Sequence, residues 1–103
     1  PYSLDIQKIA EVWNAGSLIE SRLLGVFAQA LRQSHALARV SGSVSESGMG
    51  EWAAREAAER MVAMPALTAA RDVRAASRTD ASRRSFATRL IHMARHIFGG
   101  HAV

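Results

Sequence analysis

The sequence contains no cysteine, which excludes disulfide bonds and thiolate metal sites. It has no apolar run near the roughly 20 residues that span a bilayer. Its beginning does not resemble a secretory signal either, because Asp5, Gln7 and Lys8 interrupt the apolar residues. No segment alternates as a strand would. We therefore expect an all-α, soluble and cytoplasmic protein.

Lysine is also scarce: twelve of the thirteen basic residues are arginine, and Lys8 is the exception. The net charge is +4 and the pI is near 11.0. Guanidinium groups bind carboxylates and phosphates through paired hydrogen bonds, so anionic partners are expected. With 103 residues, 49 % of them hydrophobic, the chain is long enough for one domain (residues 1–103) with a small core.

The first part of the chain has the pattern of a long helix. Apolar residues recur every three or four positions as far as Leu31, which is the spacing of one helix face. This pattern predicts a helix from Leu4 to about Ser34, with a bend near residues 14–17. The serine- and glycine-rich stretch 40–50 is predicted to be a loop.

Three further helices are expected. One begins at Glu51 and the next at Pro65, because proline is favoured at the first helical position. The last is capped by Thr79 or Ser82 and ends at Gly99. The side chains expected in the core are Trp52, Ala54, Ala57, Ala58 and Met61 from the first of these helices, Leu67, Ala70 and Val73 from the second, and Phe86, Leu90, Met93 and Ile97 from the last.

The junction Ser45–Trp52 (SESGMGEW) is a candidate anion site. Gly48 and Gly50 permit positive φ, and the helix that follows directs free N–H groups and a partial positive charge toward the loop. The same residues fit an ordinary glycine turn, and the lysine of a P-loop is absent.

Two clusters of basic residues allow a functional and a plain interpretation. His92, His96 and His101 have a spacing that permits a shared metal, but no carboxylate lies one turn away, and a solvated helix face is favoured with no metal. An arginine band could contact nucleic acid, but no aromatic residues interleave with it, which favours a solvated or inter-subunit face. The band comprises Arg71, Arg74, Arg78, Arg83, Arg84 and Arg89. No residues are assigned a catalytic role, because no acid–base pair or nucleophile motif is found.

The end of the chain, ARHIFGGHAV (residues 94–103), places Arg95 before a helix-stopping Gly99-Gly100 and His101 after it. Two donors suited to phosphate around such a hinge indicate a tail that reaches into another subunit.

Four motifs occur in an order that resembles the C-terminal helical part of 6-phosphogluconate dehydrogenase, in its shorter bacterial-type branch. They are AEVWNAGSLIESRLLGVFAQAL (10–31), SESGMGEW (45–52), SFA (85–87) and ARHIFGGHAV (94–103). The resemblance implies part of an oxidoreductase that converts 6-phosphogluconate to ribulose 5-phosphate and carbon dioxide with NAD or NADP. It also implies a homodimer, in which the tail of one subunit reaches the substrate site of the other.

By this resemblance, Arg95 and His101 bind the phosphate of the substrate, and Ser47, Gly48, Met49 and Gly50 form a loop near it. The chain departs from the family pattern at Asn14-Ala15, Glu20, Arg22 and Met49. The family's dinucleotide-binding motif and its catalytic lysine and glutamate do not occur in these residues. We therefore expect that this chain alone binds no cofactor, does not catalyse the reaction, and works with an N-terminal dinucleotide-binding domain.

The residues also allow a different class of function. A small basic helical module that binds nucleic acid or another protein, derived from a degenerate dehydrogenase, is the alternative. Nucleic-acid binding would show the steep salt dependence that counterion release produces.

Overall fold

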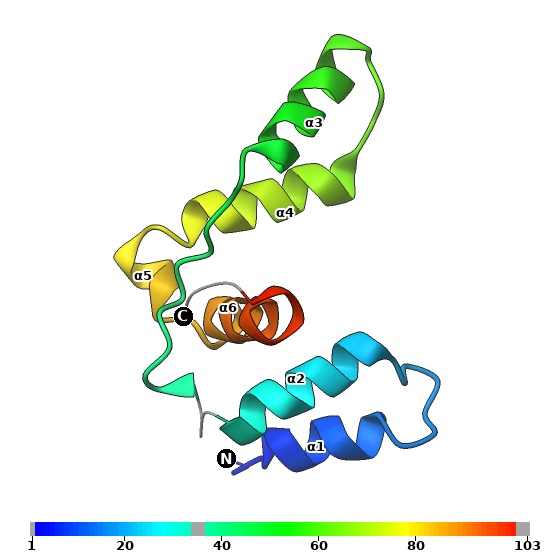
Figure 1. Ribbon diagram of the computed structural model, residues 1–103, viewed down its shortest axis with the longest axis vertical. Coiled ribbons are helices and arrows are strands. Elements are labelled where there is room, and N and C mark those ends of the chain that lie inside the picture. The colour runs from blue at the N-terminus through cyan, green and yellow to red at the C-terminus, as the bar shows by residue number, and fades with distance from the viewer. Residues whose placement is uncertain (1, 34–36, 101–103) are drawn as a thin grey trace.

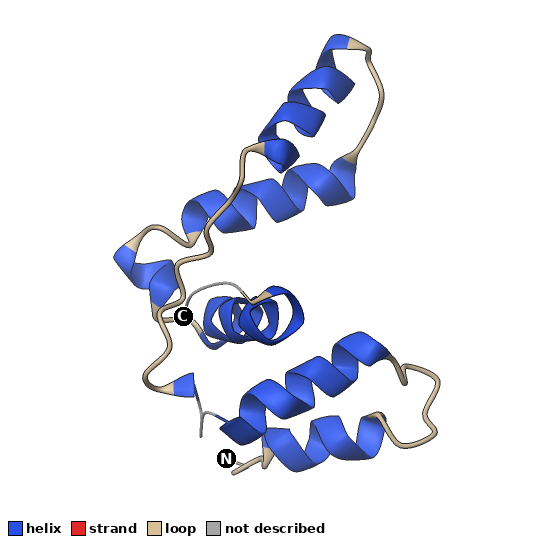
Figure 2. Cartoon of the chain, in the orientation of Figure 1, coloured by secondary structure: helices blue, strands red, loops and turns tan. Residues whose placement is uncertain are grey.

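The computed structural model describes residues 2–33 and 37–100. Within these ranges the chain forms helices and no strand (Figures 1 and 2), which confirms the all-α prediction. None of the helices in this described part is long and apolar enough to cross a bilayer. The helices are α1 (Ile6–Trp13), α2 (Arg22–Gln33), α3 (Met49–Glu59), α4 (Pro65–Ala76), α5 (Asp80–Arg83) and α6 (Phe86–Gly99).

The predicted single helix over residues 4–34 is wrong, because α1 and α2 are separate helices that fold back on each other. The break falls where the sequence predicts a bend. Gly16 adopts φ +84°, a left-handed conformation that ends a helix. Its N–H donates to the Glu20 carboxylate at 2.8 Å, and the Ser21 N–H donates to the Asn14 side-chain oxygen at 2.9 Å. Polar side chains thus close the turn and satisfy the helix ends.

The core lies where α2 packs on α1 and α6, and it is small. Three of its seven buried residues are alanines, so little apolar volume holds the helices together. Leu24, Leu90 and Ile97 pack against it from their half-buried positions. The buried residues are Ala10, Ala28, Ala30, Leu31, Leu37, Val40 and Met93.

The last helix differs from the prediction at its start. Ser85 caps α6 by accepting the Thr88 N–H at 3.1 Å, whereas Thr79 caps the short α5. Thr79 and Ser82 are therefore not the cap of α6. Phe86, expected in the core, is 45 % exposed because it is the first residue of α6, at the edge of the packed region. Met93 is buried as predicted.

The hairpin of α3 and α4 stands away from the body formed by α1, α2 and α6 (Figure 1). Both helices of the hairpin begin close to the predicted residues, with Pro65 at the first position of α4. The radius of gyration is 15.5 Å, whereas a compact chain of this length has about 13 Å. The chain therefore does not close around a single core.

The core residues predicted for this hairpin are mostly wrong. Only Ala54 and Ala57 are buried, and Leu67 is half-buried. The reason is that the two helices meet through alanines, and no other described helix forms a layer on their outer faces. The residues expected inside but found exposed are Trp52, Ala58, Met61, Ala70 and Val73.

The predicted loop is confirmed over residues 40–48, and it forms a strap along the molecule in which Val40, Gly42 and Val44 are buried. Val44 is 1 % exposed, and its N–H donates to the Ser77 hydroxyl at 3.0 Å. That hydroxyl donates in turn to the Arg74 carbonyl at 2.6 Å. One fully buried serine therefore ties the strap to the end of α4.

The Ser77→Ala substitution is expected to lower the free energy of unfolding by about 1–3 kcal/mol, because it leaves the buried Val44 N–H without an acceptor. Chemical denaturation followed by circular dichroism measures this loss. Ser43→Ala is the matched control, since Ser43 lies in the same strap and its hydroxyl makes no hydrogen bond within residues 2–33 and 37–100. Equal stability of the two variants would contradict the prediction.

Candidate functional site

Arg95, the first predicted phosphate ligand, lies on α6, in the part of the last helix that precedes the predicted glycine stop. Residues 94–99 form the end of that helix, and Ala94 is buried. The predicted stop is confirmed: Gly100 adopts φ +67° and donates its N–H to the His96 carbonyl at 2.9 Å. His101, the second predicted ligand, lies outside the described residues.

Arg95 meets Arg74 at a single backbone oxygen. The Arg95 Nη1 donates to the Ser45 carbonyl at 2.6 Å, and the Arg74 Nη2 donates to the same oxygen at 3.2 Å. In the described part of the chain, neither arginine forms an ion pair with a carboxylate. Partial burial, and secondarily the Arg74 charge, lower the pKa of Arg95. Among the described residues, the two cations therefore lie together without a neutralising carboxylate.

These arginines border an open groove of about 550 Å³ between α4 and α6. Its other walls are aliphatic, so the two guanidinium groups are the cations at its edge. Charge-assisted hydrogen bonds to an anion would be strong there, because neighbouring apolar walls reduce solvent screening. The lining residues are Val44, Ala69, Ala70, Val73, Arg74, Ile91 and Arg95.

The predicted loop Ser47–Gly50 reaches this site at one end only. Gly50 lies next to Arg74, since a Cβ on Gly50 would stand 3.4 Å from the Arg74 Nη1. Gly48 is the N-cap of α3 with φ +85°, a conformation that glycine favours. Ser47 and Met49 are exposed, and within the described ranges no hydrogen bond joins them to either arginine.

Arg74 is a site residue that the sequence analysis did not single out. It belongs to the predicted arginine band, yet it contacts Ser45, which lies 29 positions earlier in the chain. A local sequence pattern does not predict this contact, because the contact depends on how α4 packs beside the strap.

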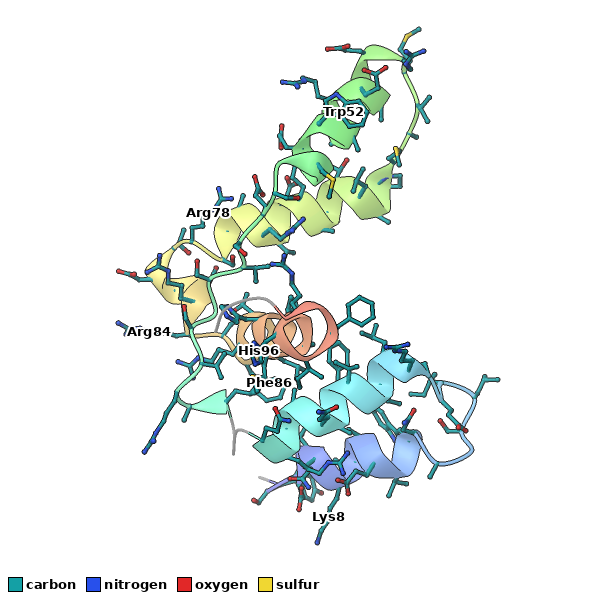
Figure 3. All side chains as sticks on the ribbon, in the orientation of Figure 1. Lys8, Trp52, Arg78, Arg84, Phe86 and His96 are labelled. Atoms are coloured by element: carbon teal, nitrogen blue, oxygen red, sulfur yellow. The ribbon has the colours of Figure 1, made fainter. Side chains whose placement is uncertain are left out.

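The rest of the arginine band is partly neutralised. Arg71 lies 3.0 Å from the Asp72 carboxylate and 3.6 Å from that of Glu51. Its hydrogen bond with Asp72 is the main cause of a raised pKa. Arg78 pairs with Glu46 at 3.2 Å. Arg84 lies on the outside of the molecule (Figure 3). This pairing favours the solvated-face interpretation over a continuous basic surface for nucleic acid.

The histidines of α6 are engaged within the chain. The His92 Nδ1 lies 2.7 Å from the Ser43 carbonyl, to which it donates. Across residues 2–33 and 37–100, no three acidic or histidine side chains gather as metal ligands.

Comparison with known proteins adds an independent line of evidence. No family model matches the sequence. Over 101 residues, 98 % of this chain, it is 33 % identical to YqeC of Bacillus subtilis, which is named as a 6-phosphogluconate dehydrogenase. Over 103 residues, 99 % of this chain, it is 34 % identical to the NAD-dependent, decarboxylating 6-phosphogluconate dehydrogenase of Haloferax volcanii. The chain spans 33 % of the length of each relative. It is therefore similar, over nearly its whole length, to one part of proteins that carry this name.

Proposed function

We propose that this chain is the C-terminal substrate-binding and dimerisation domain of a 6-phosphogluconate dehydrogenase-like oxidoreductase. The full enzyme oxidises and decarboxylates 6-phosphogluconate to ribulose 5-phosphate with NAD or NADP. Similarity along the whole chain to a third of two proteins of that name supports this assignment. The all-α fold agrees with a helical domain joined to a separate dinucleotide-binding domain.

The observation that carries the proposal is the convergence of Arg74 and Arg95 on the Ser45 carbonyl. A neutral carbonyl satisfies hydrogen bonds but leaves both positive charges uncompensated. A phosphate group beside that oxygen would accept several charge-assisted hydrogen bonds and would offset the Arg74 charge, which after partial burial is the second cause of the lowered Arg95 pKa. In this proposal His101 adds a further donor to the phosphate.

The role of these residues is to hold the substrate, not to transfer protons. Anchoring the phosphate fixes the far end of a sugar acid and so positions its reacting carbons for groups supplied by the rest of the enzyme. The nicotinamide cofactor would accept the hydride there. This chain then contributes binding energy and orientation, and it has no catalytic activity alone.

The Arg95→Ala/His101→Ala variant is expected to bind 6-phosphogluconate at least tenfold more weakly than the unmodified chain, because it loses two donors to the phosphate. Isothermal titration calorimetry measures both affinities, and circular dichroism checks that α6 remains folded. The same affinity for both proteins would reject the site.

A weak shift of DNA or RNA mobility that disappears as salt rises would instead support the basic interaction module. Binding of 6-phosphogluconate without any nucleic-acid shift at low salt separates the two functions.

A further inference from the structure

One peptide group of the strap is held from both sides, by α6 and by the end of α4. The Ser43 carbonyl accepts a hydrogen bond from the His92 Nδ1 on α6 at 2.7 Å, and the Val44 N–H donates to the Ser77 hydroxyl at 3.0 Å. Both atoms belong to the same planar unit, in which the carbonyl and the N–H point in opposite directions. Figure 1 shows the strap running past α6 and α4 on its way to α3. This peptide group therefore bridges the two helices that carry the groove arginines.

The Ser45 carbonyl follows two residues after this anchored group. Ser45 is exposed, whereas Val44 before it is 1 % exposed. On α6, His92 and Arg95 are three positions apart, so their side chains leave the same face of the helix and reach the same segment of the strap. The position of the Ser45 carbonyl thus depends on the anchored peptide group beside it rather than on side chains packed around Ser45.

This carbonyl holds two groups that repel each other. The Arg95 Nη1 donates to it at 2.6 Å and the Arg74 Nη2 at 3.2 Å. After partial burial, the Arg74 charge is the second cause of the lowered pKa of Arg95. A shared acceptor offsets part of this repulsion and keeps the two guanidinium groups side by side. An anion that contacts both then loses less conformational freedom on binding, because the groups are ordered before it arrives.

Two other contacts fix the strap, one on each side of this segment. Gly42 is buried against the Arg83 carbonyl, three residues before Ser45. After Ser45, the Glu46 carboxylate lies 3.2 Å from the Arg78 Nη2, and ion pairs between such side chains at the surface contribute little. The hydrogen bond from His92 is therefore the contact with α6 that lies next to the two arginines in the chain order of the strap.

We infer that His92 is a positioning residue of the arginine groove: by holding the Ser43 carbonyl to α6, it fixes the Ser45 carbonyl that keeps the Arg74 and Arg95 guanidinium groups together. His92 acts through the strap and not on the ligand. The inference rests on the proposed function for the identity of the ligand. The arrangement of the empty groove is measured without any ligand, so the two proposals are tested separately.

The first test measures affinity. His92→Leu is expected to bind 6-phosphogluconate and inorganic phosphate roughly fivefold to tenfold more weakly, because the strap loses a donor and the two guanidinium groups separate. His92→Asn is expected to bind within about twofold of the unmodified chain, since the asparagine Nδ2 donates from nearly the same place as the histidine Nδ1. Isothermal titration calorimetry measures these affinities, and circular dichroism checks folding. If leucine is not tolerated, His92→Ala takes its place, with the same loss expected.

Ser21→Ala is the control for a general loss of stability. Its hydroxyl accepts the Leu24 N–H at 3.1 Å at the start of α2, so the substitution removes a helix cap at a position far along the chain from the strap. This variant is expected to bind both ligands normally. An equal loss of affinity in Ser21→Ala would assign the effect of His92→Leu to stability and overturn the inference.

The second test uses the unliganded protein. The hydrogen bond to Ser45 restricts rotation of the Arg95 guanidinium group, so its Nη protons are expected to give separate signals in ¹H–¹⁵N spectra at low temperature, assigned through Arg95→Lys. His92→Leu is expected to merge them into an averaged signal like that of the exposed Arg84, and His92→Asn to keep them separate. Unchanged signals in His92→Leu, or merged signals in His92→Asn, would overturn the positioning role. An unmodified chain that binds neither ligand would reject the proposed function alone, because these spectra still decide the role of His92.

Discussion

Gly42→Ala is expected to lower the free energy of unfolding by about 3 kcal/mol and the Tm by more than roughly 10 °C. A Cβ at this position would lie 2.3 Å from the Arg83 carbonyl oxygen and 2.6 Å from the Thr88 Oγ1. Neither atom moves easily. The first is backbone at the end of α5, and the second donates to the Ser82 carbonyl at 2.5 Å. To relieve the clash, the strap that contains Gly42 would have to move away from α5 and α6.

Gly25→Ala is the control for this substitution. The nearest atom to a Cβ at Gly25 is the Asn14 Nδ2 at 3.2 Å, at the end of a side chain, and Gly25 lies inside α2. There alanine gains up to about 1 kcal/mol of helix propensity, so the variant is expected to be as stable as the unmodified chain or slightly more stable. Thermal unfolding by circular dichroism compares the two. A Gly42→Ala protein that melts within a few degrees of the control would contradict the clash.

The sequence predicts the helices well where local chemistry decides. Pro65 starts α4, Gly100 ends α6 in a left-handed conformation, and Gly16 marks the break that the pattern places near residues 14–17. Each of these positions depends on the backbone preferences of one residue. The break itself is deeper than predicted, because a side-chain hydrogen-bond network at Asn14 and Glu20 turns a bend into a reversal.

The sequence predicts burial poorly in α3 and α4, and the reason is physical. Periodicity shows that a helix has an apolar face, but it does not show what covers that face. Trp52 and Met61 fit the core pattern and are exposed in the single chain.

The candidate site also combines a residue that the sequence predicted with one that only the packing shows. The resemblance supplied Arg95, and the structure adds Arg74 through a contact across the strap. Arg74 is one of the six arginines of the band, and its neighbours in the sequence do not distinguish it from the other five. Arg74 differs from Arg71 and Arg78 in its partner. It donates to the neutral Ser45 carbonyl that also accepts from Arg95, whereas Arg71 and Arg78 form ion pairs with carboxylates.

Removing both groove arginines, in Arg74→Ala/Arg95→Ala, is expected to weaken 6-phosphogluconate binding at least a hundredfold. Each charge-assisted contact with a phosphate contributes about 1.5–3 kcal/mol, and roughly 1.4 kcal/mol corresponds to tenfold in affinity. Single variants are expected to lose about tenfold or more each, and inorganic phosphate as a second ligand should report the same order of effects. Arg84→Ala removes the same charge from an exposed position away from the groove and is expected to bind normally. An equal loss from Arg84→Ala would mean that overall charge, rather than the paired arginines on Ser45, attracts the anion.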